Sequence, residues 1–139
     1  MKKPTRQDAE MLFRLMQAFS TPEDHEAGLW FMKNYSAKDY VEFKSKYPFG
    51  SPEFVHISHV LSSYEMAGVL ISHGLLNENL YFDSVDVMYV WNMVKDIIPD
   101  WQKDAGPALW ENYVWLAKRY QWWLKNVWKP NQKWKISAR

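Results

Sequence analysis

The fold is decided by the stretch SPEFVHISHVLSSYEMAGVLISHG, residues 51–74. It begins with Ser51, Pro52 and Glu53, which supply a capping hydroxyl, a proline suited to the first helical turn and an acid that complements the helix dipole. Gly74 is suited to the left-handed position that ends many helices. Because apolar residues recur three and four apart between these signals, the stretch predicts the longest helix of the chain.

This predicted helix is apolar on more than one face. One stripe contains Ile57, Val60, Leu61, Tyr64, Ala67, Gly68 and Ile71, while Met66, Val69 and Leu70 lie beside or opposite it. A helix of this kind is usually central, or it docks one face on a partner. We therefore expect the other helices to assemble around it.

Start and stop signals on both sides of this stretch predict further helices. The expected segments are Thr5 to about Phe19, a helix opened by Thr21 and Pro22, a short helix from Ser36 and Asp39 to before Pro48, a short turn capped by Asn77, Ser84 with Asp86 to about Ile98, and Ala108 to roughly Trp128. Pro99 is expected to bend or break the chain. Strand alternation extends nowhere beyond a few residues. The sequence therefore predicts an all-α fold, a single-domain bundle of six or seven helices over residues 1–128, followed by a basic, flexible tail over residues 129–139.

The composition is that of a globular protein with a surplus of aromatic residues. Apolar residues make up 47% of the chain and charged residues 24%, but 17% are aromatic, including nine tryptophans. We expect part of this surplus to form an interface. The chain has no cysteine, and we find no secretory signal and no uninterrupted apolar run long enough to span a bilayer. These features favour a soluble, cytoplasmic protein without a transmembrane segment.

Basic residues and tryptophans are concentrated at the C-terminal end. From Ala117 onward there are seven basic and no acidic residues, so this piece carries +7 and the preceding part −6. The interaction candidates here are Trp115, Trp122, Trp123, Trp128, Lys118, Arg119, Lys125 and Lys129. They could contact nucleic acid or an anionic membrane surface, or the tryptophans could be packed inside with the lysine stems solvated. The packing interpretation is favoured because no nucleic-acid motif is present.

Three polar residues on the longest predicted helix are the candidates for a metal or small-molecule site. His56 and His59 share a helix face, but Glu65 falls nearly opposite His56, so one helix cannot complete a metal site. Partly buried, hydrogen-bonded histidines are the favoured interpretation. Glu65 is a buried polar candidate that is either functional or paired with Lys103, Lys118 or Arg119, and the structural ion pair is favoured.

Signatures of catalysis and of cofactor binding are missing from the sequence. There is no cysteine nucleophile, no Gly-x-Ser-x-Gly turn and no glycine-rich phosphate loop. We therefore expect a non-enzymatic domain without a cofactor that acts through protein contacts, either with another protein or as a homodimer.

Two stretches, SYEMAGVL at residues 63–70 and GLLNENL at residues 74–80, resemble an uncharacterised bacterial family of helical domains. The likeness continues at Trp91 and at NYVWLA, residues 112–117, and it covers roughly residues 8–118. Val114 stands where the family pattern has a glutamate. Many members carry the domain behind an N-terminal membrane anchor, which we do not recognise in this sequence. The resemblance implies a helical fold and no particular activity.

Overall fold

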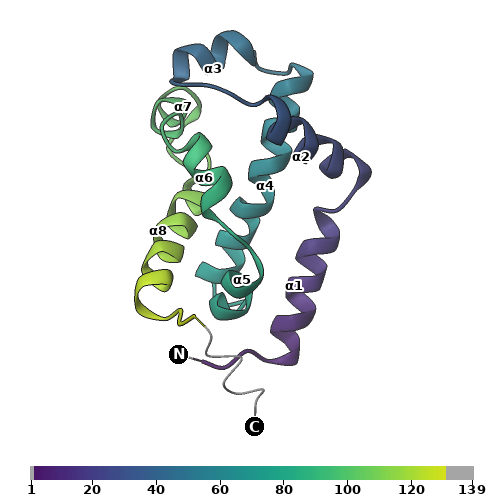
Figure 1. Ribbon diagram of the computed structural model, residues 1–139, viewed down its shortest axis with the longest axis vertical. Coiled ribbons are helices and arrows are strands. Elements are labelled where there is room, and N and C mark those ends of the chain that lie inside the picture. The colour runs from purple at the N-terminus through teal and green to yellow at the C-terminus, as the bar shows by residue number, and fades with distance from the viewer. Residues whose placement is uncertain (1, 131–139) are drawn as a thin grey trace.

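Eight α-helices follow one another in a computed structural model that describes residues 2–130 of the chain (Figure 1). No strand occurs within that range. The predicted all-α class is confirmed, and the number of helices is one or two higher than the predicted six or seven. The helices are α1 (Arg6–Ala18), α2 (Pro22–Asn34), α3 (Tyr40–Lys46), α4 (Pro52–Ser72), α5 (Glu78–Ser84), α6 (Met88–Val94), α7 (Ile98–Ala105) and α8 (Glu111–Asn126).

The additional helix is α7, which begins at Ile98, where the segment predicted from Ser84 was expected to end. Within that segment the structure has only α6, which ends at Val94. Pro99 lies in the first turn of α7, where a helix does not need the missing N–H group. Pro99 was expected to bend or break the chain; the interruption lies just before it, between Val94 and Ile98, and the proline itself belongs to the beginning of the next helix.

Two other predicted boundaries also differ from the structure. The cap of α3 is Asp39 rather than Ser36, since the Asp39 carboxylate accepts a hydrogen bond from the Glu42 N–H at 2.9 Å. The last helix begins at Glu111 rather than Ala108, because Trp110 adopts a left-handed backbone conformation with φ of 55°. The Trp110 conformation has no sequence signal, since the left-handed region is rare for a bulky residue.

Most of the predicted helix caps are confirmed. Thr5 and Thr21 form capping boxes with Asp8 and Asp24, while Ser51 and Asn77 cap α4 and α5 through their side chains. Gly74 follows the end of α4 with φ of 72°, a left-handed conformation that glycine adopts without steric cost. Short polar side chains thus fix where these helices begin.

The centre of the molecule is α4, as expected from its apolar faces. It makes its most extensive contacts with α8 and α2, and α1 packs against α4 and α5 (Figure 1). Its buried residues are Ile57, Leu61, Ala67, Gly68 and Ile71. In the described part of the chain, α4 alone is long and apolar enough to cross a membrane by length and composition. Its position between α2 and α8 is that of a core helix.

Much of the aromatic surplus lies in the core. Trp91, Trp101 and Trp123 are buried, and Trp30 and Trp110 pack partly buried against the same core. Other large, fully buried side chains include Phe31, Phe43 and Tyr113. The exposed tryptophans of residues 2–130 are Trp115, Trp122 and Trp128. Apart from Lys129 and Pro130, the predicted flexible tail lies outside the described residues.

Candidate functional site

Glu65 holds the beginning of α8 against α4. Its Oε1 accepts a hydrogen bond from the Tyr113 N–H at 3.0 Å, and its Oε2 accepts one from Nδ2 of Asn112 at 2.7 Å. Trp110, the residue before α8, gives no side-chain cap. The carboxylate of Glu65 therefore satisfies a free first-turn N–H group and lies at the positive end of the helix dipole.

This arrangement corrects the predicted partners of Glu65. The carboxylate is partly buried, and its hydrogen-bond donors are a neutral side chain and a backbone amide rather than Lys103, Lys118 or Arg119. Arg119 instead binds Glu78 through two hydrogen bonds of 2.7 Å. The sequence could not distinguish these partners, because a helix N-terminus is as good a counterpart for a carboxylate as a cationic side chain.

Close packing accompanies this hydrogen-bonded contact. A Cβ atom added to Gly68 would lie 2.8 Å from the carbonyl carbon of Asn112, so only glycine allows the two backbones to approach this closely. One turn of α4 earlier, the Tyr64 ring stacks on that of Tyr113 with centroids 4.8 Å apart. The Tyr113 ring also meets that of Trp91 at 5.1 Å.

These contacts bring together three of the four pieces of sequence on which the family resemblance rests. Tyr64 and Glu65 belong to the piece at residues 63–70, Trp91 is a piece by itself, and Asn112 and Tyr113 belong to the piece at residues 112–117. All five lie at one junction between α4, α6 and α8. The contacts of these pieces therefore describe how the helices are packed.

The two histidines do not lie together with Glu65. The His56 ring stacks on Trp30 with centroids 5.5 Å apart, while Nδ1 of His59 is 3.0 Å from Oδ1 of Asp24. Glu65 lies about 9 Å further along α4 than His59, at 1.5 Å per residue. No group of three or more His, Cys, Asp or Glu side chains within residues 2–130 is arranged to hold a metal ion.

The pair of Asp24 and His59 has a structural explanation. Burial opposes ionisation of Asp24, but the hydrogen bonds from the Thr21 side chain, from His59 and from the Thr21 backbone, together with the charge of His59, lower its pKa overall. The same carboxylate caps α2 and reaches α4. His59 thus links the start of α2 to the central helix.

The exposed interaction candidates form two groups, one on α8 and one beyond its end. We define the outer α8 face as Glu111, Trp115, Lys118, Trp122 and Lys125, which recur at intervals of three and four residues and therefore share one side of the helix. All five side chains are exposed, including 38% of Trp115 and 43% of Trp122. Trp128 and Lys129 are exposed beyond the end of the helix.

Trp123 does not belong to this exposed surface. It is only 5% exposed, and its indole N–H donates a hydrogen bond of 2.7 Å to Oδ1 of Asn79. The prediction that Trp123 is an interaction residue is therefore wrong, because its ring packs inward against Phe82 and Tyr120. In the run of tryptophans at residues 122 and 123, helical geometry sends one ring outward and the next inward.

Arg119 fixes the orientation of Trp122. Its guanidinium group lies 4.0 Å from the Trp122 ring centroid and is held at the other side by the Glu78 carboxylate. The hydrogen bonds from Arg119 to Glu78 raise the pKa of Arg119. Its charge is thus matched within the domain, whereas Lys118 and Lys125 remain exposed on the outer α8 face.

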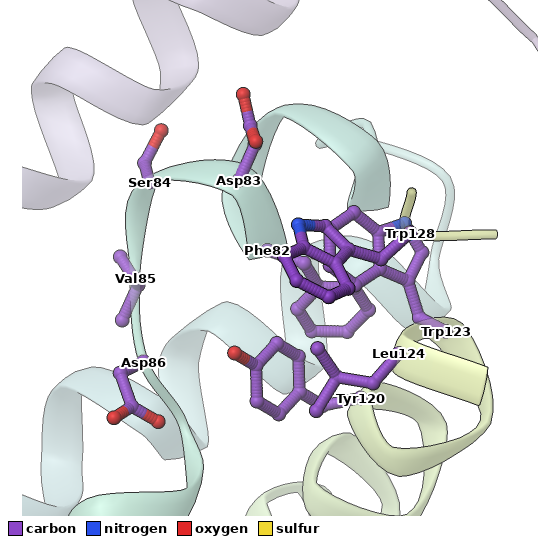
Figure 2. A pocket seen from close by; sticks show the side chains of 9 residues that line it. All are labelled: Phe82, Asp83, Ser84, Val85, Asp86, Tyr120, Trp123, Leu124 and Trp128. Atoms are coloured by element: carbon purple, nitrogen blue, oxygen red, sulfur yellow. The ribbon is translucent and has the colours of Figure 1, made fainter. Parts of the chain in front are cut away.

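A cavity that the sequence analysis did not identify lies beside the last turns of α8. It has a volume of about 300 Å³, and its lining includes Phe82, Asp86 and Tyr120, none of which was selected from the sequence (Figure 2). The only sequence signal was the aromatic pair at residues 81 and 82, which suggests strand propensity rather than a site.

Comparison with known proteins identifies the family. No curated protein and no solved structure matches the chain. A family model described as a domain of unknown function (DUF4760) matches residues 4–120, which include α1 to α7 and the first two-thirds of α8. Trp122, Lys125 and Trp128 lie beyond the matched residues. The chain belongs to this family, DUF4760, as the resemblance had indicated.

Proposed function

We propose that this domain is non-enzymatic and acts through protein–protein contacts, with a second copy of itself as the partner and the outer α8 face as the interface. The observation that carries the proposal is the pair of exposed tryptophans, Trp115 and Trp122, seven residues apart on one side of α8. Exposed tryptophans flanked by polar residues are typical of the centre of an interface.

The charge pattern of the face suits self-association. Glu111 lies at its beginning and Lys125 near its end, with Trp115 and Trp122 between them. In a two-fold symmetric dimer with antiparallel α8 helices, the first half of each face meets the second half of the other. Glu111 would then approach Lys125 of the partner subunit, and the tryptophans of the two copies would pack together.

The internal pairing of Arg119 also supports this arrangement. A two-fold axis near Lys118 brings the central cations of both copies together, which is unfavourable when they are unpaired. Since Glu78 neutralises Arg119 in each copy, the central repulsion is reduced to that of the two Lys118 side chains. Their long stems can carry the ammonium groups outward into water.

Sedimentation velocity on the full chain tests the proposal. We expect a dimer whose dissociation constant rises at least about tenfold in Trp122→Ala, as for a central interface tryptophan. Leu29→Ala, which shortens an exposed apolar side chain on α2, is the matched control and should leave the dimer unchanged. Glu111→Lys should weaken the dimer, and adding Lys125→Glu should restore it. A wild-type protein that stays monomeric at all concentrations would refute self-association.

The same face gives a second candidate function, binding to an anionic surface. Lys118, Lys125 and Lys129 are exposed next to Trp115, Trp122 and Trp128. Such a mixture of lysines and indoles suits the headgroup region of an anionic membrane or the phosphates and bases of a nucleic acid. Co-sedimentation with anionic vesicles, and a binding assay with a single-stranded oligonucleotide, would show steep loss of binding with added salt. Absence of binding at low salt would exclude this candidate.

A further inference from the structure

A second cavity lies between the end of α1, the middle of α4 and α5. Its volume is about 200 Å³. Leu15 and Tyr81 are buried and form its floor, while Met16 and Ser20 are exposed and lie at its mouth, so a small molecule can reach it from solvent. We call it the tyrosine cavity, and its lining residues are Leu15, Met16, Phe19, Ser20, Ser63, Tyr64, Tyr81 and Val85.

Three residues of the tyrosine cavity carry hydroxyl groups that are free to bind a ligand. The side chains of Ser63, Tyr64 and Tyr81 form no hydrogen bond with any other group of residues 2–130, whereas the Ser20 hydroxyl donates to the Met16 carbonyl oxygen. Tyr81 is only 3% exposed, and a buried phenol hydroxyl normally has a hydrogen-bond partner. A molecule that enters the cavity can supply that partner.

The electrostatics of the tyrosine cavity favour a neutral ligand. Burial, followed by the nearby Tyr64 phenol, raises the pKa of Tyr81, and burial, followed by the charge of Asp86, raises the pKa of Tyr64. Both phenols therefore keep their protons at neutral pH and can donate hydrogen bonds. None of the eight lining residues is a lysine, arginine, histidine, aspartate or glutamate, so a charged ligand would be buried there without a counter-charge.

We propose that the tyrosine cavity binds a small neutral carbonyl compound whose apolar part is about the size of a benzene ring. A carbonyl oxygen has two lone pairs and no proton, so it can accept hydrogen bonds from two hydroxyl donors at once. The apolar side chains of Leu15, Phe19 and Val85 suit the rest of the ligand. Since a cavity of about 150 Å³ holds benzene, about 200 Å³ accommodates a ring with a short acyl group.

The tyrosine cavity is independent of the proposed dimer interface. The outer α8 face consists of α8 residues alone, and no residue of α8 lines this cavity. Trp122→Ala should therefore weaken the dimer and leave ligand binding unchanged. The two proposals can fail separately, because one is measured by sedimentation and the other by titration with a small molecule.

Calorimetric titration of the full chain with acetophenone tests the proposal. We expect saturable one-to-one binding, at least about fivefold tighter than that of α-methylstyrene, in which a CH₂ group replaces the carbonyl oxygen. The two compounds have nearly the same shape, so the difference between their dissociation constants reports recognition of the oxygen. Absence of saturable binding, or equal binding of the two compounds, would overturn the proposal.

Replacement of single tyrosines by phenylalanine locates the site. Tyr64→Phe and Tyr81→Phe each remove one donor and keep the ring, so each should weaken acetophenone binding about three- to tenfold and leave α-methylstyrene binding unchanged. Tyr120→Phe is the matched control, because Tyr120 is also a buried tyrosine whose side chain has no hydrogen bond within residues 2–130, but it lies outside this cavity.

The three variants should all fold, since none removes a hydrogen bond that the described residues make. Thermal unfolding followed by circular dichroism checks this. Acetophenone binding that is unchanged in both Tyr64→Phe and Tyr81→Phe, or that is lost equally in Tyr120→Phe, would overturn the proposal.

Discussion

Replacing Gly68 with alanine tests how closely α4 and α8 are held together. The added Cβ would lie 2.8 Å from the Asn112 carbonyl carbon and 3.0 Å from the Asn112 Cβ. Because the nearest atoms belong to the backbone of a helix, no side-chain rotation relieves the overlap, and α8 must move away from α4. Forcing one extra carbon into such a contact costs roughly 1–3 kcal/mol. The movement also stretches the 2.7 Å hydrogen bond from Asn112 to Glu65, which is worth roughly a further 1 kcal/mol.

Gly28→Ala is the matched control for this substitution. Gly28 also lies inside a helix, α2, but a Cβ there has nothing within 4 Å. Both variants receive the same gain of about 1 kcal/mol from replacing a helical glycine with alanine. They should therefore differ by about 2–4 kcal/mol in free energy of unfolding, with Gly28→Ala more stable than the wild type and Gly68→Ala less stable. Urea denaturation followed by circular dichroism measures both, and a Gly68→Ala protein as stable as Gly28→Ala would refute the close contact.

Three further predictions concern polar groups of the core and of the helix caps. Glu65→Ala should lower the free energy of unfolding by about 1–3 kcal/mol, because it leaves the donors of Asn112 and Tyr113 unpaired. Glu65→Gln should lower the free energy of unfolding by less. Urea denaturation measures both variants, and unchanged stability in both would contradict the capping role. Tyr35→Phe should keep or raise the thermal midpoint of unfolding, since the buried Tyr35 hydroxyl has no hydrogen-bond partner within residues 2–130. Tyr47→Phe should lower the thermal midpoint, because it removes the hydroxyl that accepts a hydrogen bond of 3.2 Å from the Ser36 N–H. The pKa of Asp24 is lower in the folded protein than in the unfolded chain, so its contribution to stability is complete above the unfolded pKa of about 4 and is lost as the pH falls through the folded pKa. Urea midpoints measured between pH 2 and 6 should therefore fall less steeply toward acid in Asp24→Asn than in the wild type; identical profiles would refute the assignment.

The helical framework could be predicted because its signals are local. A capping hydroxyl or carboxamide satisfies backbone N–H groups within three residues of itself, as it does at Thr5, Thr21, Ser51 and Asn77. Gly74 likewise adopts a conformation that depends on its own backbone alone. Helix α7 was not predicted because Pro99 is compatible with either the end or the beginning of a helix.

The contacts between helices could not be predicted in the same way. Glu65 lies 47 residues from Asn112 along the chain, and its sequence neighbourhood does not indicate whether a lysine, an arginine or a helix end will face it. Trp122 and Trp123 are neighbours in the sequence, and it is the position of α5, whose Asn79 and Phe82 contact Trp123, that places Trp123 inside and leaves Trp122 outside. The cavity beside the last turns of α8 joins side chains of α5, its following connection and α8, so it becomes visible only once these segments are placed together.

The attachment of α8 along its whole length explains why its outer face can act as a rigid surface. Glu65 fixes the first turn, Arg119 binds Glu78 in the middle, and Trp123 binds Asn79 in the last turns. Each contact uses the inner side of α8 or its edge, which leaves the outer indoles exposed on a helix that cannot rotate. Because Arg119 also holds the Trp122 ring, part of the conformational entropy that binding would otherwise cost is lost already on folding. In the proposed dimer, the partner subunit would therefore meet a surface that is already arranged before the encounter.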